Sequence, residues 1–127
     1  MSRFEIMRSY GVEFRNCDAR NFSDIANVFN EFKPTRVVHL AAIASSVEAR
    51  KDPGKCFDLQ LSTLRNVLDL CRLDQNIIKT LMFLSSSTVY GDFDDVWVDE
   101  TTRARPRGIY ANTKYMGERL VRTYCHT

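Results

Sequence analysis

The chain has 127 residues, of which 44% are hydrophobic and 27% charged, and its formal net charge is +2 at pH 7. This length suits one domain at most, and the small net charge does not favour binding to nucleic acid or to a membrane surface. No apolar run reaches the roughly 20 residues that a membrane-spanning helix needs. The four cysteines are scattered and there are only two histidines, so we expect buried thiols, no metal site and a reducing, cytoplasmic location.

The N-terminal third is expected to contain a helix end, a strand and a complete helix. Residues 1–10 are typical of the end of a helix or of a frayed segment leading into the domain. Residues 12–17 alternate apolar and polar side chains, which predicts a strand with one covered face. Asn21 or Ser23 is expected to cap the next helix, which ends before Pro34. Its apolar face recurs at helical spacing: Phe22, Ile25, Ala26, Phe29 and Phe32.

Strands and helices alternate in the remainder of the chain. Residues 36–42 and 80–84 are apolar on both faces, which predicts strands buried in a parallel sheet. Between them, Pro53 suits the first turn of a long helix that reaches about residue 73. A last helix is expected over residues 110–124. This order predicts an α/β fold with a parallel sheet and right-handed crossovers.

Chemically useful side chains gather where these strands end. Ala41 and Ala42 close the first strand, and the hydroxyl-rich segment Ser85–Gly91 follows the second. In an open α/β sheet, ligands bind at the carboxyl ends of the strands. Tyr110 and Lys114 are four residues apart, so they share one face of a helix. A phenol beside an ammonium and a serine can exchange a proton with a substrate hydroxyl, because the ammonium favours the phenolate.

The ordered series Asp18, His39-Leu40-Ala41-Ala42, Ser85–Gly91 and Tyr110-x-x-x-Lys114 resembles the extended short-chain dehydrogenase/reductase family. Within that family it is similar to the NAD-dependent nucleotide-sugar epimerases and dehydratases. The resemblance implies a partial doubly wound, Rossmann-like parallel sheet with flanking helices. Residues 1–127 would form part of an NAD-binding domain, from its third strand to the Tyr–Lys helix, without a second domain.

The resemblance also implies roles for individual residues. Tyr110 would be the catalytic acid/base, Lys114 would favour its phenolate and hold the nicotinamide ribose, and Ser86 would hydrogen-bond the reacting sugar hydroxyl. Ser85 would face the cofactor or be structural. Tyr110 would also contact the cofactor, and the other positions implied for binding NAD or NADP are Asp18, Ala41, Ala42 and Gln60. For Asp18 a helix cap or Asx turn is nearly as well supported, and His39 is better explained as a core histidine.

The implied activity is the epimerisation of a nucleotide-diphosphate sugar, since Thr88 stands where similar dehydratases carry an acidic residue. A dehydratase or reductase of the same family and a non-catalytic interaction subunit stay open as alternatives. The Gly-rich turn that would cradle the NAD pyrophosphate does not occur in the sequence, so we expect the isolated chain to be inactive.

The first two strands of such a domain would also be missing, which leaves three hypotheses for the sheet. Strands 12–17 and 36–42 pair directly in a three-stranded sheet, or a second copy or partner chain supplies the missing strands. The third and favoured hypothesis is that the sequence is a piece of a longer protein.

Overall fold

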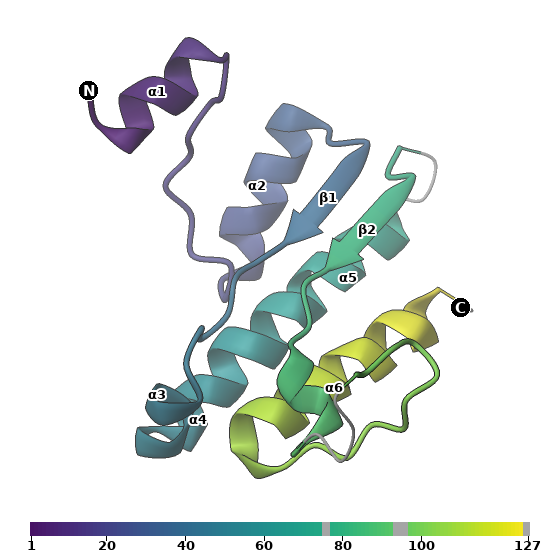
Figure 1. The fold of residues 1–127 in the computed structure, drawn as a ribbon. Helices are drawn as coiled ribbons and strands as arrows, with labels where there is room; N and C mark the ends of the chain where they lie inside the picture. The colour runs from purple at the N-terminus through teal and green to yellow at the C-terminus, as the bar shows by residue number, and fades with distance from the viewer. Residues whose placement is uncertain (75–76, 93–96, 126–127) are drawn as a thin grey trace.

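The computed structural model describes residues 1–74, 77–92 and 97–125. Within these ranges, no helix is long and apolar enough to cross a membrane, and no three His, Cys, Asp or Glu side chains cluster as metal ligands would. The elements follow one another as α1 (Arg3–Ser9), α2 (Phe22–Phe32), β1 (Arg36–His39), α3 (Ser46–Lys51), α4 (Pro53–Phe57), the π-helical segment η1 (Asp58–Ser62), α5 (Thr63–Leu73), β2 (Thr80–Phe83), the 3-10 helix η2 (Ser87–Tyr90) and α6 (Gly108–Tyr124) (Figure 1).

A parallel pair of strands forms the sheet, which confirms the predicted α/β class. Arg36 of β1 lies opposite Thr80 of β2, and His39 lies opposite Phe83. The crossover between them contains α3, α4, η1 and α5 (Figure 1). The last three of these run on directly from one another over residues 53–73, with Pro53 in the first turn, as the sequence predicts.

One face of the sheet packs against helices α2 and α5 (Figure 1). Val37 and Leu81 point into this interface. Its buried centre consists of Phe29, Val67 and Leu70, surrounded by Ile25, Ala26, Cys71 and Ile78. Helix α6 covers the same face at Phe83.

The opposite face of the sheet is exposed in the described residues. Val38, Leu40, Met82 and Leu84 each leave more than half of their surface open to solvent. The prediction that both strands are buried on both faces is therefore wrong for this structure. The physical reason is that the helices packing on the sheet lie on one side of it, so only alternate residues of each strand are covered.

The predicted strand over residues 12–17 is also wrong. Its backbone is irregular, and the Val12 amide donates to the carbonyl of Met7 at 3.2 Å instead of joining the sheet. The Phe14 ring meets the Phe4 ring edge to face, with centroids 5.1 Å apart, and Arg15 donates to Glu31 at 2.8 Å. The segment thus contacts α1 and α2, and the hypothesis of a directly paired three-stranded sheet fails.

The start and end of α2 follow local rules. Asn21 is the cap, as one of the two predicted candidates, and its Oδ1 accepts from the amides of Ser23 and Asp24. Lys33 ends the helix in a left-handed conformation, with φ at 46°, immediately before Pro34.

Candidate active site

Lys114 on α6 reaches the carboxyl end of β2. Its ammonium donates to the carbonyl of Leu84 at 2.9 Å and lies 5.3 Å from the centroid of the Phe83 ring. The side chain is buried, and burial lowers the pKa of the Lys114 ammonium. An ammonium can donate three hydrogen bonds, so donors beyond the one to Leu84 remain for a ligand at this strand end.

The close approach of α6 to β2 depends on a glycine. A Cβ atom at Gly117 would lie 2.5 Å from Cζ of Phe83 and 3.2 Å from Cδ2 of Leu64. Because Gly117 has no side chain, the helix can lie directly against the Phe83 ring. This contact is one turn away from Lys114 and sets how far its side chain must reach to the strand end.

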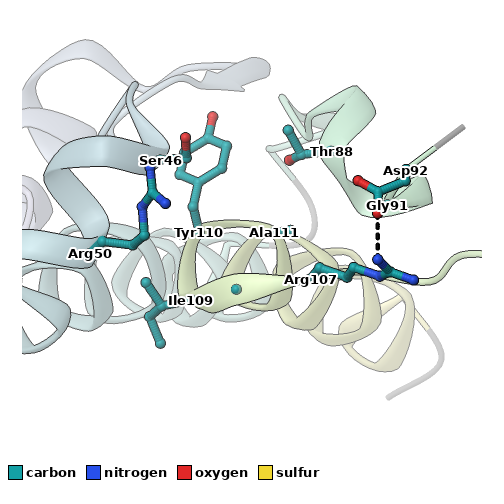
Figure 2. A pocket seen from close by; sticks show the side chains of 10 residues that line it. Ser46, Arg50, Thr88, Gly91, Asp92, Arg107, Ile109, Tyr110 and Ala111 are labelled. Carbon is teal, nitrogen blue, oxygen red and sulfur yellow. Dashed lines mark hydrogen bonds and ion pairs between the residues drawn. The ribbon is translucent and has the colours of Figure 1, made fainter.

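Tyr110 lies one turn before Lys114 and lines a pocket of about 380 Å³. Figure 2 shows its phenol rising from α6, with Ser46 and Arg50 of α3 on one side and Thr88 of η2 on the other. Gly91, Asp92, Arg107, Gly108, Ile109 and Ala111 complete the lining. A pocket of this size admits a group about as large as a monosaccharide ring.

Ser85 and Ser86 follow β2 and make different hydrogen bonds. Ser86 caps η2, and its Oγ accepts from the amide and the hydroxyl of Thr88, at 3.3 and 2.9 Å. Since Thr88 lines the pocket, Ser86 is one hydrogen bond away from the space beside Tyr110. Ser85 instead donates to Glu118 of α6 at 2.5 Å. Ser86 is thus linked to the pocket through Thr88 but is not among the described residues that line it, and Ser85 is held against α6.

Gln60 links the π-helical segment to α6. Its Nε2 donates to the Thr113 hydroxyl at 2.7 Å and to Cys56 Sγ at 3.2 Å. The Thr113 hydroxyl donates to backbone carbonyls of its own helix, so it accepts from Gln60. Among the described residues, Oε1 of Gln60 has no hydrogen-bond partner although it is buried. This oxygen is an acceptor still open to a ligand or a water molecule.

Asp18 lies apart from this pocket, at the turn before α2. Its carboxylate accepts from the backbone amide of Arg20 at 3.0 Å and from the Arg20 guanidinium at 2.6 Å. These bonds hold the pKa of Asp18 at about 2. The local turn that we weighed against a cofactor role is thus present, and the side chain stays exposed.

The end of β1 presents small residues and a buried imidazole. Ala41 is exposed and Ala42 is half-buried. His39 stacks on the Phe83 ring with centroids 6.1 Å apart, and its Nε2 lies 3.4 Å from the Thr63 hydroxyl. Burial lowers the pKa of His39. These contacts agree with its interpretation as a core histidine.

Two residues of the site were missed in the sequence. Glu118 follows Lys114 by four positions, so the spacing of Tyr110, Lys114 and Glu118 at every fourth residue marks one helix face and would have identified it. Arg50 had no such signal. It reaches the pocket from a separate helix, 60 positions before Tyr110, and only the packing of α3 on α6 brings the two together.

One known protein family matches nearly the whole chain. The sequence model of the family described as "NAD dependent epimerase/dehydratase family" matches residues 2–127. Over 126 residues the chain is 30% identical to the bifunctional protein gal10 of Schizosaccharomyces pombe and 32% identical to UDP-glucuronate 4-epimerase 2 of Arabidopsis thaliana. These alignments cover 96% and 98% of the chain.

A solved structure shows the same arrangement. The UDP-glucose 4-epimerase of Thermus thermophilus, in complex with NAD, superposes with a TM-score of 0.83 and 34% identity, over 90% of this chain and 37% of that one. The chain spans 17% of the length of the gal10 protein and 29% of the length of the Arabidopsis enzyme.

Proposed function

Because this chain belongs to the NAD dependent epimerase/dehydratase family, we propose that it carries the catalytic helix and strand end of a nucleotide-sugar 4-epimerase. Similar proteins include UDP-glucose and UDP-glucuronate 4-epimerases, which supports a UDP-sugar as the substrate. The observation that carries the proposal is the placement of Tyr110 and Lys114 on one face of α6. Lys114 reaches the end of β2, and Tyr110 lines a pocket with Thr88.

In this proposal Tyr110 exchanges a proton with the sugar hydroxyl. A free phenol has a pKa of about 10, so it needs a nearby positive charge to accept that proton at neutral pH. Lys114 supplies the charge from the next turn of α6. Ser86 hydrogen-bonds the reacting hydroxyl and keeps it within reach of the phenol, and Thr88 holds the Ser86 hydroxyl in place.

The residues present fit a nicotinamide cofactor. Lys114 retains donors and Gln60 retains a buried acceptor, which are the two kinds of partner that ribose hydroxyls require. Ala41 and Ala42 leave room for a flat group at the end of β1. The chemistry that NAD or NADP supplies when bound is the acceptance and return of a hydride at the sugar carbon. Ser85 supports this site indirectly, through Glu118.

The cysteines support an intracellular place for this activity. Cys17, Cys56, Cys71 and Cys125 are all free thiols in the structure. Free thiols are typical of a reducing compartment, and we propose the cytoplasm.

Two measurements test the proposed function. NAD should raise the melting temperature of the chain by mass action, and a flat response would favour the non-catalytic alternative. We expect the isolated chain to be inactive, so any epimerisation of UDP-glucose that it does catalyse should fall by about 10²–10⁴-fold in Tyr110→Phe, because the general acid/base is removed.

Tyr115→Phe is the matched control, because it removes a phenol hydroxyl from the same helix outside the pocket. Equal and measurable rates for Tyr110→Phe and Tyr115→Phe would reject the assignment of Tyr110. A retained effect of NAD on melting in Tyr110→Phe would show that the fold and the cofactor site survive the substitution.

A further inference from the structure

Arg50 lies beside Tyr110 in the pocket and has no partner among the residues that the structure describes. Figure 2 shows its side chain extending from α3 along the Tyr110 side of the pocket, and both residues line that pocket. Among the described residues, no hydrogen bond or ion pair engages the Arg50 guanidinium. A guanidinium offers five donors in a planar fork, so a ligand in this pocket meets a complete, unused anion-binding group.

The second arginine of the pocket is already neutralised. Arg107 forms an ion pair with Asp92, drawn as the dashed line in Figure 2. Two arginines against one aspartate leave the lining with a net charge of +1, located at Arg50. The pocket therefore favours a group with one negative charge, which Arg50 can match.

We propose that Arg50 binds a carboxylate on the substrate sugar, so that the pocket selects nucleotide-linked uronic acids over neutral sugars. This inference rests on the proposed function, in which the reacting hydroxyl must reach Tyr110. A sugar held there has its other substituents within the same pocket of about 380 Å³. Arginine and carboxylate match as a fork of two parallel hydrogen bonds, which fixes the orientation of the ring as well as its charge.

The position of Arg50 argues for the sugar end of the substrate. The guanidinium shares its pocket with Tyr110 and Thr88, which are the residues placed at the reacting hydroxyl. A diphosphate carries more charge than Arg50, the one unpaired cation among the described pocket residues, can match. Either a sugar carboxylate or a diphosphate could be the anion that binds Arg50, and direct titration distinguishes the two.

The experiment follows amide resonances of the pocket residues 108–111 while glucuronate, glucose or inorganic pyrophosphate is added to the chain. Glucuronate should bind at least about tenfold more tightly than glucose, because a charge-assisted hydrogen-bond pair is gained. Arg50→Gln should abolish that preference. Lys51→Gln is the matched control, since it removes the same charge from the same turn of α3 but lies outside the pocket lining.

Each outcome decides the proposal. Equal binding of glucuronate and glucose, or an unchanged preference in Arg50→Gln, would overturn it. Pyrophosphate that binds more tightly than glucuronate and depends on Arg50 would also overturn it, in favour of a diphosphate. The titration needs no NAD, so a failure of the proposed function, seen as an absent effect of NAD on melting, is distinguished from a failure of this inference.

Discussion

Replacing Gly117 by alanine tests how closely α6 packs on β2. In an exposed helix this change stabilises by about 1 kcal/mol. Here the new Cβ would lie 2.5 Å from Cζ of Phe83, whereas carbon atoms in contact are about 3.5–4.0 Å apart, so the ring must retreat by about 1 Å. Phe83 is held by His39 on one side and by Lys114 on another. Overpacking of this kind costs about 1–3 kcal/mol. We therefore expect a net loss of about 1 kcal/mol in the free energy of unfolding.

Urea unfolding followed by circular dichroism measures this loss. Gly54→Ala is the control, because its Cβ would meet Oδ1 of Asp52 at 3.6 Å, an ordinary contact, and should stabilise by up to about 1 kcal/mol. Adding Phe83→Leu to Gly117→Ala removes the ring and should reduce the clash. If Gly117→Ala raised the stability as much as Gly54→Ala, the packing of α6 against Phe83 would be refuted.

Three further substitutions test the core, the pH response and a helix cap. Leu64→Ala should lower the free energy of unfolding, measured in urea, by about 2–5 kcal/mol, because Leu64 is fully buried. Leu73 is exposed, so Leu73→Ala should change it by less than about 0.5 kcal/mol. Similar losses for the two variants would contradict the core described above. Burial lowers the pKa of His39 below 6.5, so the unfolded chain takes up the proton first and stability should fall as pH drops below that value. His39→Gln should flatten this dependence when unfolding is compared at about pH 7 and about pH 5, and an unchanged slope would assign it to another group. Asn21→Ala should cost about 1 kcal/mol of thermal stability and Asn21→Asp should restore it, since either Asn or Asp accepts from the first amides of α2; equal melting temperatures would exclude the cap.

Elements whose signals are local could be predicted from the sequence. The cap at Asn21, the proline at position 53 and the helical spacing of apolar residues placed α2 and the 53–73 helix correctly. The last helix was predicted from residue 110, and α6 begins at Gly108. The alternation over residues 12–17 was misleading because a strand needs a neighbouring edge, and periodicity says nothing about the partner. Exposure of one sheet face could not be predicted for the same reason, since an apolar residue in a strand does not reveal what covers it.

In the candidate site, too, the sequence identifies some residues but not the contacts that they make. Tyr110 and Lys114 were identified because four-residue spacing on a helix fixes a common face. The contact of Lys114 with the Leu84 carbonyl, the bond from Ser85 to Glu118 and the open oxygen of Gln60 depend on side-chain conformations across distant segments. No pattern in the sequence contains those conformations. The roles assigned to Ser86, Tyr110 and Lys114 stay predictions until the variants above are measured.

The exposed face of the sheet affects the conditions under which the protein can be purified. Val38 of β1 and Met82 of β2, with Leu40 and Leu84 just after these strands, expose apolar surface to the solvent. Sulfate and phosphate salts strengthen contacts between exposed apolar surfaces, whereas urea weakens them. We therefore expect the protein to stay monomeric when it is purified at low protein concentration in buffers with little sulfate or phosphate.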